Sequence, residues 1–285
     1  MVPSGHTAGR DQASAEATEW LLGTCGAPEV FFAQLVRKGI DEVLDGPRTG
    51  RWDFGQLEKT ERTYVGTKLE IMIRSALGLE RGETMDLVIA GHEVDVKWSM
   101  TSAWQIPEEA HGHLCLCLGG MHLLTAFQVG LVRCRPEYLN LGRNKDRKTT
   151  LSKAGREAMT MLVPPSELPQ NFVATIDPEV RERVVAHRTI QARVSALMRA
   201  LPYTPIPREA IRTVARTEGD PIRRLRADAH HGDPFDGFKV LSARYGNAIV
   251  RALGRDPLKP DEFMAVPVAD IERLPVDVRR EPGQD

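Results

Sequence analysis

MDLVIAGHEVDVKWSM, residues 85–100, is the stretch that decides how the first half of this chain folds. Two runs in which apolar and polar residues alternate flank Ala90 and Gly91, a pattern typical of a β-hairpin. Counting outward from that turn places Asp86 opposite Asp95. One face then carries Leu87, Ile89, Val94, Val96, Trp98 and Met100, and the other carries Asp86, Glu93, Asp95, Lys97 and Ser99.

The polar face of this hairpin suggests metal chemistry. Carboxylates that lie opposite one another on antiparallel strands repel unless a cation lies between them, and Mg²⁺ binds through one or two carboxylates plus water and substrate phosphate. Lys97 projects from the same face, where its ammonium can contact a phosphate and position the attacking water. Glu70, on a helix predicted just upstream, can add a third carboxylate. This is the pattern of PD-(D/E)xK nucleases, although Asp-x-Lys also arises by chance on half-buried strands.

Longer stretches around the hairpin resemble the NaeI-type restriction endonucleases, type II enzymes that require two DNA sites. The resembling stretches are GPRTGRWDFGQLEKTERTYVGTKLE (46–70), ETMDLVIAGHEVDVKWSM (83–100), GHLCLCL (112–118), GLVRCRPEYL (130–139) and LSKAGREA (151–158). The resemblance implies that Glu70, Asp86, Asp95 and Lys97 are the catalytic residues. Asp86 and Asp95 would hold Mg²⁺ with support from Glu70, and Lys97 would position the water. Residue 85 is Met where the pattern has Pro, which contributes no ligand.

The remaining periodicity predicts two domains in these 285 residues. Helices are expected over 12–44 and about 57–77, strands over about 113–118 and 125–134, and a basic loop over 143–153. Helical patterns follow over about 180–201, 207–217, 220–229 and 239–253. We therefore predict an α/β (α+β) restriction-endonuclease-like domain with a central mixed sheet (1–163), a proline-rich linker (164–179), and a mainly helical, winged helix-turn-helix-like domain (180–285).

Charge is distributed unevenly along the chain. The whole sequence has 38 Lys and Arg against 39 Asp and Glu, a net charge of −1. Residues 180–255, however, carry 15 basic and 7 acidic side chains, whereas residues 256–285 carry 4 and 8. The basic stretch predicts a DNA-binding module, because DNA responds to the local field; an Arg-rich solvated surface is the simpler alternative. The expected DNA contacts are Arg48, Arg51, Arg223, Arg224, Arg226, Lys239, Arg244 and Arg251.

Two other motifs have simpler explanations. Residues 43–48 resemble the K-x-D-G-x-R motif of nucleotidyl-transferring ligases, but Val43 stands at the lysine position, so there is no amine nucleophile. His111, His113, Cys115 and Cys117 alternate along one strand, where side chains spread too far apart to converge on one zinc ion. We expect buried, reduced thiols there.

Together these patterns predict a type II site-specific deoxyribonuclease that uses Mg²⁺ and cuts double-stranded DNA as a homodimer. The resemblance implies a GC-rich palindrome, GCCGGC in the family's namesake, and activation by a second bound site. The alternative is a helix-turn-helix regulator whose nuclease-like half is inactive. The sequence has no secretion signal and no apolar stretch of membrane-spanning length, so we expect a cytoplasmic protein that contacts no membrane.

Overall fold

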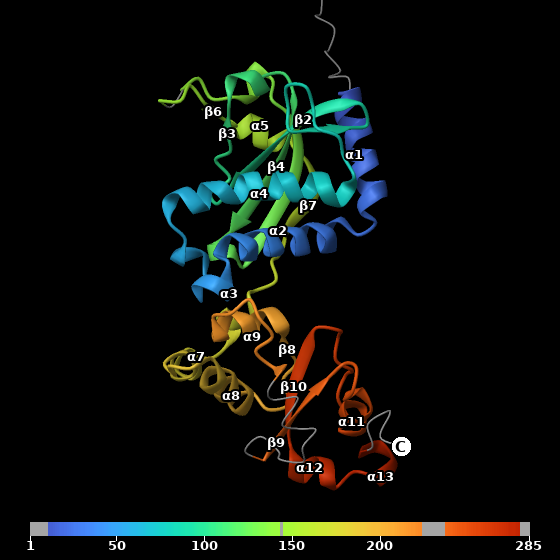
Figure 1. Cartoon of the computed structure of the whole chain (residues 1–285). Coiled ribbons are helices and arrows are strands. Elements are labelled where there is room, and N and C mark those ends of the chain that lie inside the picture. Colours follow the sequence, from blue (N-terminus) through green and yellow to red (C-terminus); the bar gives the residue numbers. More distant parts are fainter. Residues whose placement is uncertain (1–10, 143–144, 224–236, 280–285) are drawn as a thin grey trace, which may run out of the picture. The chain divides into compact units, whose positions relative to one another are not determined.

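The structure, a computed structural model, describes residues 11–142, 145–223 and 237–279. The chain divides into two compact units (Figure 1). The first contains residues 1–43 and 57–170, and the second contains residues 44–56 and 171–285. Within the described ranges, no helix has the length and apolar character needed to span a membrane.

The first unit is built on a mixed sheet with the strand order β1-β2-β4-β5-β7. Its strands are β1 (Leu87–Ile89), β2 (His92–Ser99), β4 (Leu114–Met121), β5 (Ala126–Arg133) and β7 (Thr160–Glu167). β2 and β4 run parallel, and the other neighbours are antiparallel. This confirms the predicted central mixed sheet. A separate antiparallel pair is formed by β3 (Gln105–Ile106) and β6 (Thr149–Thr150).

The predicted hairpin is confirmed with its register. Ile89 pairs with His92 and Leu87 with Val94, so Ala90 and Gly91 form the turn. Both turn residues have positive φ, +50° and +80°, as a two-residue hairpin turn of this kind requires.

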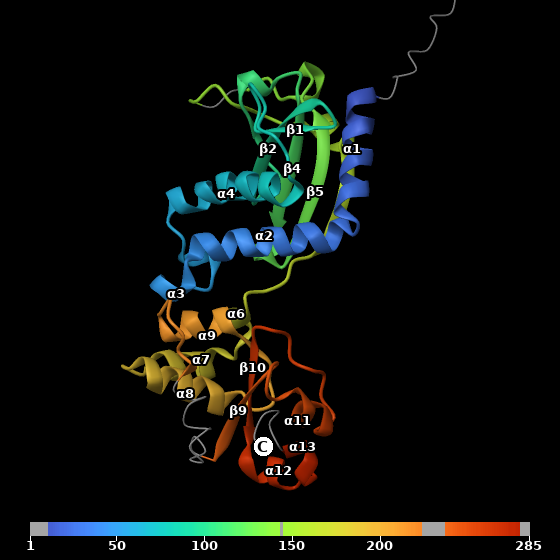
Figure 2. The same cartoon turned by 45° about the vertical axis from the view of Figure 1, so that its right-hand side comes forward.

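Among the described residues of the first unit, the α-helices are α1 (Gln12–Cys25), α2 (Pro28–Leu44), α4 (Lys59–Leu77) and α5 (Lys153–Glu157). Helix α4 packs against β2 and buries Val65, Leu69 and Ile73. Helices α2 and α4 lie side by side (Figures 1 and 2). They touch at Gly39, where an added Cβ would lie 2.7 Å from Leu69 Cδ2. Glycine at this position therefore leaves room for the Leu69 side chain between the two helices.

Residues 12–44 are helical, as predicted, and form two helices, α1 and α2. Gly26, with φ +63°, ends α1. Pro28 begins α2, and a proline without an N–H cannot continue a helix that precedes it.

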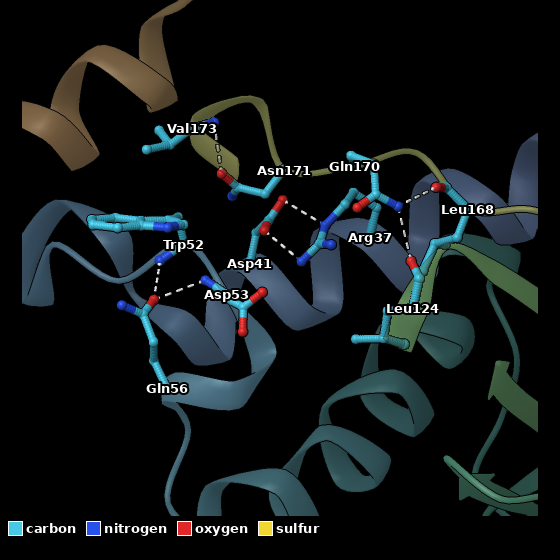
Figure 3. A network of polar contacts seen from close by, with 10 residues as sticks. All are labelled: Arg37, Asp41, Trp52, Asp53, Gln56, Leu124, Leu168, Gln170, Asn171 and Val173. Carbon is cyan, nitrogen blue, oxygen red and sulfur yellow. Dashed lines mark hydrogen bonds and ion pairs between the residues drawn. The ribbon is translucent and has the colours of Figure 1, made fainter. Parts of the chain in front are cut away.

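Polar contacts fix two parts of the first unit near its boundaries (Figure 3). On α2, Arg37 Nη2 pairs with Asp41 Oδ1 at 2.7 Å. Gln170, the last residue of the unit, donates to the backbone oxygens of Leu124 and Leu168 at 3.0 and 3.1 Å. The end of the unit is thus tied to the loop before β5.

The second unit combines helices with a small sheet. Its helices are α3 (Gly46–Thr49), α6 (Phe172–Thr175), α7 (Pro178–Val185), α8 (Ile190–Ala200), α9 (Arg208–Ala215), α11 (Asn247–Ala252), α12 (Val268–Glu272) and α13 (Val276–Arg279). Its strands are β8 (Ile206–Pro207), β9 (Phe238–Ser242) and β10 (Glu262–Pro267). They form an antiparallel sheet with the order β8-β10-β9.

Residues 44–56 are built into this second unit although they lie in the N-terminal part of the sequence. Trp52 packs against the apolar cluster around α8 and α9, and the Arg181 guanidinium lies 5.2 Å from the centre of its ring. Gln56 Oε1 accepts hydrogen bonds from the backbone of Trp52 and Asp53 at 2.8 and 2.9 Å (Figure 3). Residues 44–56, which include most of the ligase-like motif, therefore pack as part of the second unit.

Two sequence expectations for the second half need correction. Prolines 164 and 165, expected in a linker, lie in β7, which is possible because an edge strand does not need every N–H for pairing. The helix expected over 239–253 is instead β9 followed by α11, and β10 forms the buried central strand of the sheet. The second unit therefore combines its helices with the small β8-β10-β9 sheet. Most of the helix expected over 220–229 lies outside the described residues.

Candidate active site

Asp86 and Asp95 lie where the hairpin register predicts. Asp86 precedes β1 by one residue, and its Oδ2 accepts a hydrogen bond from the backbone N–H of Val96 at 2.8 Å. Asp95, on β2, is only 5% exposed. The hairpin thus holds one carboxylate at its edge and one in the interior.

Lys97 lies beside Asp95 because side chains two residues apart on a strand share a face. Its Nζ lies 2.6 Å from both carboxylate oxygens of Asp95 and 3.2 Å from the backbone oxygen of Val96. The ammonium and the carboxylate are mostly buried, so their attraction is screened less than it would be at the surface.

Burial changes the protonation of this pair. It raises the pKa of Asp95 to about 6, with Asp86 adding to the rise and Lys97 opposing it. Burial also disfavours the charged form of Lys97, but the carboxylates of Asp95 and Asp86 outweigh burial and raise its pKa above the usual range. Lys97 therefore stays a cation at neutral pH. Asp95 is a carboxylate whose negative charge a bound cation would stabilise.

Glu70 projects from α4, the helix that packs against β2. Its Oε1 accepts a hydrogen bond from Arg74 Nη1, one turn later, at 3.3 Å. Burial and the charge of Asp86 raise its pKa, whereas Arg74, Arg81 and Lys97 lower it. These couplings place Glu70 in the same electrostatic neighbourhood as Asp86 and Lys97.

Three residues that touch this site had no role in the sequence prediction. Glu93 Oε1 accepts hydrogen bonds from the backbone N–H groups of Thr84 at 2.8 Å and Met85 at 3.5 Å. These bonds hold the backbone that directly precedes Asp86. Arg74 holds Glu70, and Cys115 contacts Asp95. The alternation of the hairpin placed Glu93 on the polar face, and helical spacing put Arg74 one turn from Glu70. Contact between Cys115 and Asp95 depends on strand pairing that leaves no local signal.

The chemistry of the donors fits a hard divalent cation, which prefers oxygen ligands. In the described part of the chain, no three His, Cys, Asp or Glu side chains gather into a group that could hold an ion by themselves. Asp86 and Asp95 are the carboxylates that the hairpin brings together, which matches a site completed by water and phosphate. His111, considered above for zinc, instead contacts Thr149 Oγ1 at 3.2 Å, and Cys115 and Cys117 are buried free thiols, as expected.

Comparison with known protein families matches residues 28–277 to the family described as restriction endonuclease NaeI. The match runs through both units. This chain belongs to the NaeI restriction endonuclease family. A relative is the type II restriction enzyme NaeI of Lentzea aerocolonigenes, which is 36% identical over 202 residues. The aligned part covers 68% of this chain and 63% of that protein.

The predicted DNA contacts of this NaeI family member are distributed over the second unit. Arg48, 66% exposed, pairs with Asp45 at 2.6 Å and Glu218 at 3.7 Å. Arg51 donates through Nε to the backbone oxygen of Leu44 at 3.2 Å, so part of its guanidinium serves the fold.

The other predicted contacts lie in the C-terminal part of this unit. Arg223 is exposed at the end of the described segment, and Arg224 and Arg226 lie outside the described residues. Lys239 is on β9, and Arg251 is exposed on α11. Arg244 is exposed and stacks over the ring of Tyr245 at 4.9 Å.

Proposed function

We propose that this protein is a Mg²⁺-dependent type II deoxyribonuclease that hydrolyses one phosphodiester on each strand of a specific DNA site. The observation that carries the proposal is the close grouping of Asp86, Asp95 and Lys97 on one hairpin, beside Glu70, in a chain of the NaeI family. This grouping combines two carboxylates with a cation near the place where a phosphate would bind.

Each side chain has a distinct role in this proposal. Asp86 and Asp95 would hold Mg²⁺, with Glu70 as a further carboxylate toward it. When bound, the cation would polarise the phosphate and lower the pKa of a coordinated water. Lys97 would give up part of its contact with Asp95. Its ammonium would then contact a non-bridging phosphate oxygen and orient the attacking water. Its raised pKa keeps it protonated for this contact.

Two arginines add positive charge near Glu70. Arg74 and Arg81 both lower the pKa of Glu70, and Arg74 Nη1 lies 3.3 Å from its Oε1. An incoming phosphate would find positive charge there as well as at Lys97, and guanidinium groups match phosphate geometry. We infer that these arginines help to offset the repulsion between a DNA backbone and the carboxylates.

The second unit would supply DNA affinity. Residues 180–255 carry a net charge of +8, and basic surfaces bind the phosphate backbone in a salt-dependent way. We propose that this unit is a winged helix-turn-helix-like module in which short helices accompany the β8-β10-β9 sheet. It would bind a second copy of the site and activate cleavage, as the family resemblance implies.

A palindromic target calls for a two-fold arrangement of protein. We therefore propose that the active form is a homodimer and that the target is a GC-rich palindrome similar to GCCGGC, both as implied by the family resemblance. The cytoplasmic location expected from the sequence is part of this proposal, since the DNA substrate and the reduced thiols both suit that compartment.

The test is cleavage of unmethylated plasmid DNA that contains candidate palindromes. Wild-type protein with Mg²⁺ should produce discrete fragments, and Asp95→Asn should produce none while it still binds the DNA. Glu157→Gln, which changes an exposed carboxylate on α5, is the matched control and should cut like the wild type. Specific binding without cleavage by the wild type on any substrate would support the alternative, a DNA-binding regulator with an inactive nuclease-like unit.

The second-site proposal has a separate test. Plasmids with two candidate sites should be cut faster than plasmids with one, and adding a short duplex that contains the site should restore cutting of the one-site plasmid. Equal rates on both plasmids, with no effect of the added duplex, would contradict activation by a second site.

A further inference from the structure

The parallel pairing of β2 and β4 places a thiol against the buried carboxylate of the candidate active site. Asp95 and Cys115 are direct partners in this register. Cys115 Sγ lies 3.8 Å from Asp95 Oδ2, within reach of an S–H···O hydrogen bond. Cys115 is fully buried and Asp95 is 5% exposed, so water competes little for this oxygen.

A second thiol continues the contact. Cys134 follows β5 and lies diagonally across the sheet from Cys115, with their sulfur atoms 3.0 Å apart. The donor in each of these hydrogen bonds follows from which groups carry a proton. An ionised carboxylate only accepts, so the Cys115 proton points to Asp95 and the Cys134 proton points to the Cys115 sulfur.

We propose that Cys115 is a positioning residue for Asp95, held in place by Cys134, and that its thiol orients the carboxylate toward the cation that the proposed function requires. The positioning role rests on the proposed function, whereas the hydrogen bond between Cys115 and Asp95 exists without it. Groups that hydrogen-bond to metal ligands orient them and tune their affinity for the ion. A thiol suits this place because a weak donor satisfies a buried oxygen without competing strongly with a cation.

The sheet offers a matched control on the same strand. Cys117 lies two residues further along β4, is equally buried, and belongs to the same apolar cluster as Cys115 and Cys134. Cys117→Ala removes a thiol of the same size from the same surroundings but leaves the bond between Cys115 and Asp95 in place. It reports the packing cost of losing a thiol here.

The first measurement is the infrared S–H stretching band of metal-free protein, which moves to lower frequency when the thiol donates a hydrogen bond. Cys115→Ser identifies the Cys115 band by its loss. Asp95→Asn should move that band to higher frequency, because an amide accepts more weakly than a carboxylate, and Cys117→Ala should leave it unchanged. A Cys115 band at the same frequency in wild type and Asp95→Asn would overturn the proposal. This measurement needs no catalysis, so it stays decisive even if the protein cuts no DNA.

The second measurement is calorimetric titration of Mg²⁺. Cys115→Ala should weaken binding about 10-fold, at the lower end of what such supporting groups contribute. Cys115→Ser, which retains a donor, should restore it, and Cys117→Ala should match the wild type. Equal affinities for Cys115→Ala and Cys117→Ala would contradict the positioning role. If Cys115→Ala does not fold, as judged by thermal unfolding, the infrared comparison of wild type and Asp95→Asn decides. Absence of Mg²⁺ binding in the wild type would contradict the proposed function instead.

Discussion

At the scale of single residues, opposing effects act on the ionisation of Asp95. It is buried at 5% exposure, lies 2.6 Å from the Lys97 ammonium and accepts from the Cys115 thiol. Each contact favours the carboxylate, yet burial still raises its pKa to about 6. Asp95 is therefore incompletely compensated in the metal-free protein. A bound cation would supply the missing positive charge.

This imbalance predicts a pH dependence of stability. Because the folded pKa of Asp95 lies above its ordinary value of 3.8, the folded state binds the proton more tightly than the unfolded state. The contribution of Asp95 to the free energy of unfolding should therefore fall as pH rises from about 4 to about 6, by at most about 3 kcal/mol.

Urea unfolding of metal-free wild type and Asp95→Asn across this pH interval tests the effect. The wild type should lose stability relative to the variant as pH rises, because Asn does not titrate. Parallel pH profiles for the two proteins would show that Asp95 is not destabilised by ionisation in the folded state.

At the scale of elements, local patterns predicted the hairpin well and non-local packing poorly. Alternation over residues 85–100 predicted the register, in which Leu87 pairs with Val94. It did not predict that Asp95 and Ser99 on the polar face would be buried as well. The pairing of β2 with β4 joins segments separated in sequence, so the position of Cys115 beside Asp95 left no periodic signal. Residues 238–242 form a strand and not the start of a helix, because periodicity does not distinguish short apolar runs.

The segment 44–56 is the clearest element whose role depends on distant packing. A Cβ added to Gly46 would lie 2.2 Å from Thr213 Oγ1 and 2.9 Å from Thr213 Cγ2, on α9. Gly50 adopts φ +72° and lies against the side chain of Arg216. Gly46, the glycine of the ligase-like motif, therefore allows α3 to lie close to α9.

Gly46→Ala should destabilise the protein by about 1–3 kcal/mol, the usual cost of overfilling a packed contact. Chemical denaturation measures it, and Gly23→Ala is the control. Gly23 lies in α1 with no atom within 4 Å of an added Cβ, so alanine there should be neutral or slightly stabilising. Equal free energies of unfolding for Gly46→Ala and wild type would show that the α3–α9 contact accommodates the extra methyl group at no cost in stability.

At the scale of the whole molecule, the chain passes between the two units at three points, after residues 43, 56 and 170. The C-terminal residues therefore do not make up the whole second unit. Trp52 packs against its main apolar cluster. Within the C-terminal part, Arg208 at the start of α9 pairs with Asp220 and with Asp261, which precedes β10. The expected boundary at residue 180 also omits α6 and the start of α7.

A fragment of residues 171–285 should therefore fold poorly by itself. Loss of Trp52 alone removes a partly buried aromatic side chain from this cluster, which should cost about 1–3 kcal/mol, less than for a fully buried tryptophan. Fusing residues 44–56 to the fragment through a flexible linker should restore cooperative unfolding and salt-dependent DNA binding, measured by circular dichroism and fluorescence anisotropy. Cooperative unfolding of the fragment without residues 44–56 would contradict this assignment.

The measurement that tests the central claim most directly is the single-turnover cleavage rate of a duplex that contains the target site, at saturating Mg²⁺, for wild type and Lys97→Met. Lys38→Met, which changes an exposed lysine on α2, is the control. Lys97→Met should bind the duplex like the wild type and cut it about 10²–10³-fold more slowly, the usual loss on removing one group that stabilises transition-state charge. Lys38→Met should cut at the wild-type rate. Cleavage by Lys97→Met at the wild-type rate would show that the hairpin is not the active site.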